Sequence, residues 1–327
     1  MKGFDPHFRD LPDYIVKITK EIWEDRGLAT LHRYYGPDIP MRFPSGLVRG
    51  NAGVIDGTLA TLAEFPDRKL LAEDVIWSGT DEEGFLSSHR IVTSGTHTGH
   101  GAFGPPTGRR FEVRTIADCA ARNNVIDDEW LIRDVGGIAT QLGIAPSDFA
   151  LAQIAAEGGP ESAVRPFHPR DDVQGPYRGR GNDSEWGARL AAILTRIMDK
   201  DIAVIGEAYD RAVRTEHPSA TGGWGTGFAE TSWMRLRSSF PGAEFAIHHA
   251  IGRDDPMMPP RAAIRWSLTG AHSGYGRFGA PTGTEVHVMG ITHAEFGPFG
   301  PDGVSVRREF TLWDDVAIWK QIHLGAA

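Results

Sequence analysis

Residues 95–108 read GTHTGHGAFGPPTG and residues 270–283 read GAHSGYGRFGAPTG, so one glycine-rich motif occurs twice in the chain. Matching positions lie 175 residues apart, as His97 and His272 do. The same offset pairs Asp118 with His293 further along the chain. Each copy is as long as a whole domain, which predicts a duplicated domain rather than a solenoid of small repeats.

The offset grows towards the end of each copy. Asp134 and Gln141 match Asp314 and Gln321 at a spacing of 180, which predicts a five-residue insertion around Gly297 to Gly303. Loops tolerate such changes of length better than helices or strands do. We therefore expect a longer loop there in the second copy.

The duplication divides the chain into three parts. We predict a first domain over residues 1–143, a linker over 144–188 and a second domain over 189–327. Gly, Pro and charged residues are dense in the middle part, as is typical of a linker. An ordered strap is the alternative, anchored by aromatic side chains (Phe167, Tyr177 and Trp186).

Composition excludes several classes of protein. The 327 residues carry a net charge of −9, which argues against nucleic acid or an anionic membrane as the main partner. One cysteine, Cys119, allows no internal disulfide and fits a reducing compartment. The sequence lacks the apolar run of a signal peptide or a membrane span, so we expect a soluble cytoplasmic protein.

Hydrophobic periodicity changes in the same order in both copies. A long opening helix is followed by a second helix, over Ala52–Phe65 and Phe228–Phe240, which a proline ends in each copy. Strands are then predicted near 70–79, 85–97, 111–121 and 125–134, followed by a short helix. Helices followed by consecutive strands are typical of an α+β fold with an antiparallel sheet packed on helices.

The glycine-rich motif itself contains GxGxxG, at Gly99–Gly104 and Gly274–Gly279. A dinucleotide site needs a helix directly after these glycines, whereas proline and then a strand follow here. We interpret the motif as a hairpin loop, in which His97 and His272 make loop-fixing hydrogen bonds.

The runs THTGHGAFGPPTGRRFEVRTIADC (96–119) and EWLIRDVGGIATQLG (129–143) resemble the SnoaL-like polyketide cyclases of the nuclear transport factor 2-like superfamily. The second copy repeats them more loosely. The resemblance implies two cone-shaped, cystatin-like domains, each a curved antiparallel sheet wrapped on helices around an apolar cavity, fused as a pseudo-dimer. Family cyclases close a ring by intramolecular aldol condensation with an aspartate and a histidine, and without metal or cofactor.

Carried over residue by residue, the family aspartate corresponds to Asp134 and, in the second copy, to Asp314. The family histidine aligns with Asp118 and His293. Only the second copy therefore has the aspartate–histidine pair, and the first departs from the pattern at Asp118.

Strand alternation supports a buried acid at these positions. Asp134 shares a strand face with Trp130, and Asp314 shares one with Phe310. Apolar neighbours raise the pKa of a carboxyl group, as a general base for a weakly acidic C–H requires.

His293 lies between apolar residues on the preceding strand, and its imidazole could donate to the carbonyl oxygen that becomes charged in aldol attack. The predicted catalytic residues are Asp314, His293, Asp134 and Asp118. The predicted substrate-binding residues are Trp130, Phe310, Trp313 and Met289.

The sequence thus predicts a cofactor-free cyclase, isomerase or lyase that acts on an apolar carbonyl compound in a cavity, with a homo-oligomer left open. A metal site of His248, His272, His287 and His293 is disfavoured, and Cys119 is expected in the core. One alternative is a non-catalytic binding or assembly protein. A weaker one is an epoxide hydrolase-like enzyme, for which Arg133-Asp134 and Arg308-Glu309 supply ingredients.

Overall fold

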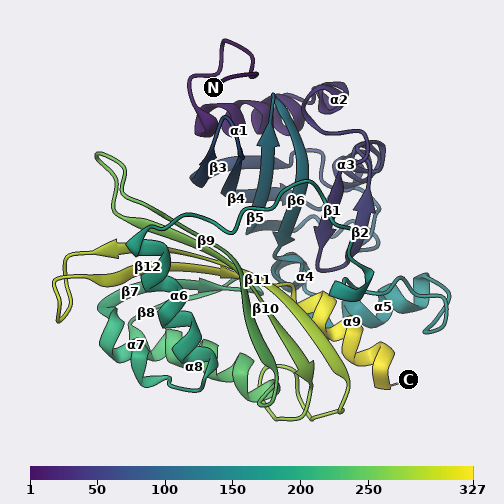
Figure 1. Cartoon of the computed structure of the whole chain (residues 1–327). Helices are drawn as coiled ribbons and strands as arrows, with labels where there is room; N and C mark the ends of the chain where they lie inside the picture. The colour runs from purple at the N-terminus through teal and green to yellow at the C-terminus, as the bar shows by residue number, and fades with distance from the viewer. Residues whose placement is uncertain (327) are drawn as a thin grey trace.

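A computed structural model describes residues 1–326, and it consists of two domains that each contain a six-stranded sheet (Figure 1). The sheet orders are β2-β1-β6-β5-β4-β3 and β8-β7-β12-β11-β10-β9, so the second sheet repeats the topology of the first. Four consecutive strands in each sheet are antiparallel. A hairpin extends each sheet at one edge, where its first strand pairs in parallel with the last of the four, as β1 does with β6 and β7 with β12. The α+β class and the duplicated cone fold are confirmed.

The first domain begins with helix α1 (Leu11–Thr19), which continues into a π-helical turn (Lys20–Glu24). Its remaining elements are a 3-10 turn (Leu28–Thr30), α2 (Leu31–Tyr34), β1 (Pro40–Phe43), β2 (Gly46–Arg49), α3 (Ala52–Glu64), β3 (Lys69–Thr80), β4 (Gly84–Thr96), β5 (Arg110–Arg122), β6 (Val125–Arg133) and α4 (Val135–Leu142).

The middle segment holds α5 (Pro146–Ala156) and a 3-10 turn (Pro169–Asp171). The second domain comprises α6 (Glu185–Met198), α7 (Ala203–Ala208), β7 (Tyr209–His217), β8 (Thr221–Trp224), α8 (Thr226–Ser239), β9 (Glu244–Arg253), β10 (Arg261–Ala271), β11 (Glu285–Gly297), β12 (Ser305–Leu312) and α9 (Asp315–Ala326).

The four long strands of the first domain and the second helix of each copy are confirmed, within a few residues of their predicted bounds. The predicted insertion is also present. A two-residue turn, Asn123–Asn124, joins β5 to β6, whereas residues 298–304 form a seven-residue loop between β11 and β12. The GxGxxG motifs lie in the hairpin loops between β4 and β5 and between β10 and β11, as predicted.

The opening helix is where the prediction fails. Instead of one long helix, the first domain has α1 and a π-helical turn, and the second has two helices, α6 and α7, followed by strand β7 from Tyr209. The hairpins β1–β2 and β7–β8 are also absent from the prediction. Strands β1, β2 and β8 have only four residues, too few for a period to be recognised, whereas the nine-residue β7 follows directly on a helix and was included in the helical pattern.

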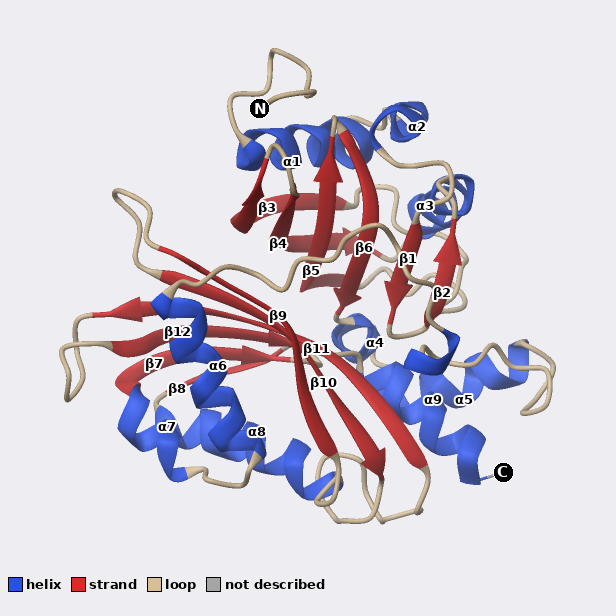
Figure 2. Ribbon diagram, viewed as in Figure 1, coloured by secondary structure: helices blue, strands red, loops and turns tan. Residues whose placement is uncertain are grey.

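The central strands of each sheet are buried on both faces, and Figure 2 shows how the helices and the two sheets are arranged. The inner face wraps around the helices of its own domain, as where Trp266 packs beside Leu194 of α6. The outer faces pack against each other, and Ile116 and Ile132 of the first sheet meet Met289 and Ile291 of the second. The sheet-to-sheet interface makes the two copies a pseudo-dimer.

Contacts across this interface follow the duplication. Arg90 and Arg265 occupy equivalent positions on β4 and β10. The Arg90 guanidinium lies 3.5 Å from His293 Nδ1, and the Arg265 guanidinium lies 3.4 Å from Asp118 Oδ2. Since Asp118 and His293 are also equivalent, the same pair of positions meets twice, as in a two-fold interface.

The segment between the domains is an ordered strap. Phe167 packs in the interface core, and Tyr177 Oη lies 2.7 Å from His249 Nε2. Asp172 accepts a hydrogen bond from Arg42, which Asp128 also contacts. Helix α5 packs on α9, so the strap touches both domains.

We expect Asp128→Ala to lower the free energy of unfolding by about 3–5 kcal/mol, because it removes one partner of a buried ion pair. Arg42 and Asp128 are both almost fully buried. Urea unfolding monitored by tryptophan fluorescence measures the change. Asp171→Ala, on an exposed turn of the strap, is the matched control and should shift stability by less than about 0.5 kcal/mol.

Candidate functional site

The first domain contains an apolar cavity of about 300 Å³ between its sheet and its helices. Ile15 and Ile18 of α1, Val54 of α3 and Ile91 of β4 supply apolar walls. Gly57 faces open space, since a Cβ atom placed there would meet no atom within 4 Å. The hollow is large enough for a medium-sized organic molecule.

Few ionisable side chains line this cavity. They are His89 on β4, Glu129 and Arg133 on β6, Arg68 ahead of β3, and the weak acids Tyr35 and Cys119. The strand register arranges three of them. Glu129 pairs with Cys119 on β5, whereas His89 is two strands from β6 and opposite Ala117. Adjacent strands are about 4.8 Å apart, so roughly 10 Å separates the backbones that carry His89 and Glu129. A flat molecule could lie between their side chains.

Glu129 supplies the one carboxyl group among the described residues that line the cavity. Burial raises the pKa of its carboxyl group to about 8, and no hydrogen bond to its side chain offsets this within residues 1–326. A carboxyl group with this pKa exchanges protons near neutral pH, which suits general acid–base chemistry.

His89 has the opposite property. Burial lowers its pKa to about 3, so the imidazole stays neutral, and its Nε2 atom is buried without a hydrogen-bond partner in the described chain. A neutral imidazole can still donate a hydrogen bond to a carbonyl oxygen. Burial also raises the pKa values of Tyr35 and Cys119, so both remain protonated.

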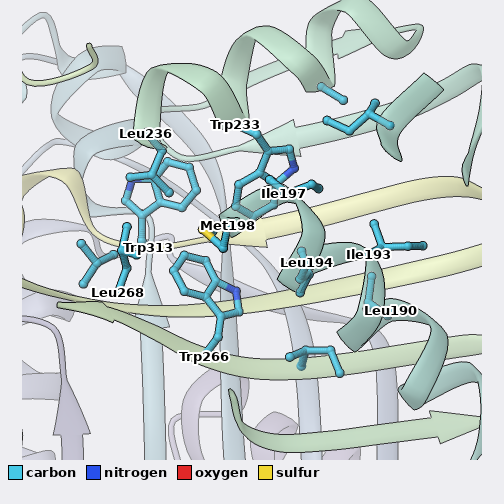
Figure 3. Packing of buried hydrophobic residues seen from close by; sticks show 14 of the residues in the cluster. Leu190, Ile193, Leu194, Ile197, Met198, Trp233, Leu236, Trp266, Leu268 and Trp313 are labelled. Atoms are coloured by element: carbon cyan, nitrogen blue, oxygen red, sulfur yellow. The ribbon is translucent and has the colours of Figure 1, made fainter. Parts of the chain in front are cut away.

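The interior of the second domain is filled with side chains instead. Trp233, Trp266 and Trp313 pack together in its core, as Figure 3 shows, and all three are fully buried. The positions equivalent to them by the repeat are Thr58, Ile91 and Arg133, all of which line the cavity of the first domain. Three exchanges to tryptophan thus separate a packed core from a hollow one.

The equivalent of Glu129 in the second copy is Glu309, and its surroundings differ completely. It accepts hydrogen bonds from Tyr209 Oη at 2.5 Å and from Thr311 Oγ1 at 2.7 Å, and it lies 3.2 Å from His217 Nε2. Burial alone would raise the pKa of Glu309, but these partners hold it below its ordinary value. Glu309 is therefore a satisfied structural acid.

The structure places the predicted aspartates at helix starts. Asp134 precedes α4, and its carboxylate accepts hydrogen bonds from the backbone of Gly137, Ser219 and Ala220, each at 2.8 Å. Asp314 precedes α9 and accepts from the Val316 N–H at 2.9 Å. Burial raises the pKa of Asp134 to about 6 and that of Asp314 to about 8. Both are buried as expected, but neither lines the cavity of the first domain.

His293 and Asp118 lie on the outer sheet faces, between the domains. His293 Nε2 is 2.7 Å from Ser88 Oγ, and burial with neighbouring Arg90 lowers its pKa well below the ordinary value. Asp118 faces Arg265. Asp314 and His293 do not line a common cavity among those found in residues 1–326.

Three of the four predicted substrate-binding residues also lie between the domains. Met289 belongs to the interface core, Trp130 stacks under the guanidinium of Arg265 at 3.6 Å, and Phe310 does so under that of Arg90 at 3.8 Å. Trp313 is in the filled core of the second domain. Trp130 and Phe310 lie on the outer face of their sheets, which packs against the other domain, and not on the inner face that lines a cavity.

The lesser predictions fare as follows. Nδ1 of His97 and of His272 lies 3.1 Å and 3.2 Å from a threonine hydroxyl of its own loop, which confirms the loop-fixing role. Residues 1–326 hold no group of three or more His, Cys, Asp or Glu side chains that could bind a metal ion. Within the same residues, the helices are too short or too polar to cross a bilayer.

A curved antiparallel sheet around helices, with an apolar hollow, defines a cone of the nuclear transport factor 2-like class. Residues 14–142 match the family model of the SnoaL-like polyketide cyclases, which confirms the predicted resemblance for the first domain. Comparison with curated protein sequences finds no match.

Solved structures with a similar fold each cover about one domain of this chain. IdmH from Streptomyces antibioticus, described as a candidate polyketide cyclase, is 27% identical and covers 41% of this chain and 98% of its own, with a TM-score of 0.36. AclR from Streptomyces galilaeus, described as a candidate hydroxylase, is 19% identical over 40% of this chain and 80% of its own, with a TM-score of 0.36. TsrD from Streptomyces laurentii is 20% identical over 40% of this chain and 93% of its own, with a TM-score of 0.35.

Glu129, His89 and Arg68 were missed by the sequence analysis. A signal for the cavity was nevertheless present in the repeat, because tryptophans of the second copy align with smaller or charged residues of the first. Reading the two copies against each other identifies the inner face of each strand.

We expect the double variant Ile91→Trp, Thr115→Gly to fill the cavity without unfolding the first domain, because the equivalent cross-strand pair Trp266 and Gly290 accommodates an indole in the same fold. Binding of an apolar fluorescent probe should fall at least tenfold, measured by titration, while the melting temperature changes by only a few degrees.

The reverse change is the matched control. Trp266→Ile leaves a void in the filled core of the second domain and should lower the free energy of unfolding by about 3 kcal/mol, measured in urea. An equal loss of unfolding free energy in both variants would contradict the assignment of a hollow first domain and a filled second domain.

Proposed function

We propose that the first domain is an enzyme that abstracts and returns protons next to the carbonyl group of an apolar molecule, in a cyclase, isomerase or lyase reaction. Glu129 is the acid–base residue. The observation that carries this proposal is a carboxyl group without hydrogen bonds in an apolar cavity, with a pKa raised to about 8. The match of residues 14–142 to the SnoaL-like polyketide cyclase family supports small-molecule chemistry of this general kind.

In this proposal the Glu129 carboxylate removes a proton from the carbon beside the carbonyl group. The negative charge moves to the carbonyl oxygen, where the neutral His89 imidazole donates a hydrogen bond. The carbanion then attacks a second carbonyl in an aldol cyclisation, or takes the proton back at another carbon in an isomerisation. Glu129 holds the proton in between, and a pKa near 8 allows both directions.

The second domain has a different role in this proposal. Its equivalent acid, Glu309, is held by hydrogen bonds, and its core contains three tryptophans where the first domain is hollow. It covers the outer face of the catalytic sheet and takes no part in chemistry. The alternative is a non-catalytic binding protein. In that case the first domain binds ketones in its cavity without exchanging their protons.

Hydrogen–deuterium exchange tests this proposal without knowledge of the natural substrate. We expect the protein to accelerate exchange of the α-protons of 2-tetralone in D₂O, followed by NMR. Glu129→Gln should lower the accelerated rate by about 10²-fold or more, since it removes the base.

The variant Asp314→Asn tests whether Glu129 or Asp314 is the base. Asparagine is as good a helix cap as aspartate, so this variant should fold and keep its exchange rate. Loss of exchange in Asp314→Asn but not in Glu129→Gln would overturn the proposal. Binding of 2-tetralone with no exchange by the unaltered protein would favour the binding function.

The pH dependence follows from the same carboxyl group. Because the base must be ionised, the exchange rate should rise with pH and level off above about 8. The profile is measured from pH 5.5 to 9.5 in constant ionic strength. A rate that is flat across this range would contradict the role of Glu129.

Stability should show the opposite trend. The pKa of Glu129 is higher in the folded chain than its ordinary value of 4.5, so the carboxyl group costs stability as pH rises from 4.5 to about 8. Glu129→Gln removes that cost. The melting temperature of the variant should therefore exceed that of the unaltered protein by more at pH 8 than at pH 5, measured by calorimetry.

A further inference from the structure

Two arginines at one end of the cavity are not used by the chemistry above. Arg68 lies between α3 and β3, and Arg133 is the last residue of β6. Arg133 occupies the same row of the sheet as Thr115 and Ile91, and all three line the cavity. Both guanidinium groups thus belong to one end of the hollow.

Neither guanidinium has a partner in the described chain. Within residues 1–326, no carboxylate lies within 4.0 Å of either group, neither side chain donates a hydrogen bond, and Nε of Arg133 is buried and unpaired. Arg68 is only 4% exposed. Burial lowers the pKa of both groups, Arg133 lowers that of Arg68 further, and the more distant Asp314 partly offsets the effect at Arg133.

The other buried arginines in residues 1–326 each have a carboxylate or carbonyl partner, although Nε of Arg261 and one terminal nitrogen of Arg265 make no hydrogen bond. Arg42, Arg90, Arg261 and Arg265 each pair with at least one carboxylate, and Arg237 donates to two backbone carbonyl groups. An unpaired buried charge is strongly destabilising, so proteins rarely keep one without a use. Arg68 and its neighbour Arg133 are the exception, and they occur at the hollow.

The duplication gives an independent indication. The positions equivalent to Arg68 and Arg133 are Ala243 and Trp313 in the second copy, where the core is filled. The two cations and the hollow are thus present in one copy and absent together from the other. If Arg68 and Arg133 had a purely structural role, they would not need to occur only in the copy that has a cavity.

The arginines are also well separated from the proposed base. Glu129 and Arg133 share the inner face of β6 and are four residues apart, which places their Cα atoms about 13 Å from each other. No arginine contributes to the pKa of Glu129. A molecule of medium length could therefore place one group at each end.

We propose that Arg68 and Arg133 bind a carboxylate of the substrate, so that the substrate class is an apolar carbonyl compound that carries a carboxylate at its far end. Two guanidinium groups match the planar, doubly accepting carboxylate. The remaining walls bind the apolar body, and the carbonyl group lies between Glu129 and His89. The placement of the carbonyl group rests on the proposed function, whereas binding of the carboxylate by the two arginines does not depend on it.

Calorimetric titration of the full chain with octanoate and with its neutral analogue octanamide tests this inference. We expect octanoate to bind at least tenfold more tightly than octanamide. The preference should disappear in Arg68→Met and in Arg133→Met. It should survive in Arg110→Met, an exposed control at the start of β5. It should also survive in Glu129→Gln, so a failed catalytic assignment and a failed binding site give different results.

A second readout separates a binding role from a structural one. Without ligand, Arg68→Met should melt at a higher temperature than the unaltered protein, because an unpaired buried charge is removed. Equal affinity for octanoate and octanamide, or a preference that survives both arginine substitutions, would overturn the inference. So would loss of folding in both variants, since it would make the guanidinium groups structural.

Discussion

The packing of the two outer sheet faces against each other is the constraint on which the rest of the structure depends. Antiparallel sheets commonly leave one face in water, but here both faces of each sheet are covered. The outer faces hold apolar clusters and the paired contacts of Arg90 and Arg265 with the opposite domain. Side chains on these faces, Asp118 and His293 among them, are therefore committed to packing. The apolar cavity lies on the inner face of the first sheet, and a smaller, more polar cavity lined by Asp134 and Phe310 lies between the domains.

The inner faces of the two copies have diverged in opposite directions. In the second copy, three tryptophans fill the cone and Glu309 is held by Tyr209 and Thr311. In the first, the equivalent space is open and Glu129 has no partner. A hollow and an unsatisfied acid both cost stability, and proteins tolerate such costs mainly where function requires them. A packed partner domain that covers the outer face helps the first domain to bear these costs.

The fold could be predicted from the sequence because its signals are local or periodic. The repeated glycine motif identified the duplication, proline ended the second helix, and alternation located the long strands. The site could not be found in the same way. Trp130 and Ile132 share one face of β6, while Glu129 and Leu131 share the other, and both faces are rich in apolar residues. When both faces of a strand are buried, hydrophobicity alone does not indicate which one lines the cavity.

Sequence alone therefore determined the number of domains, the class of their fold, the loop insertion and the family resemblance of the first copy. Only the tertiary structure decided that Asp134 and Asp314 precede helices, that Glu129 faces a hollow, and that Arg68 and Arg133 line it with no carboxylate of residues 1–326 within 4.0 Å. The physical reason is that the pKa and the role of an ionisable group depend on neighbours from distant parts of the chain. Those neighbours depend on how the two sheets pack against each other. The residues of a single strand do not specify this packing.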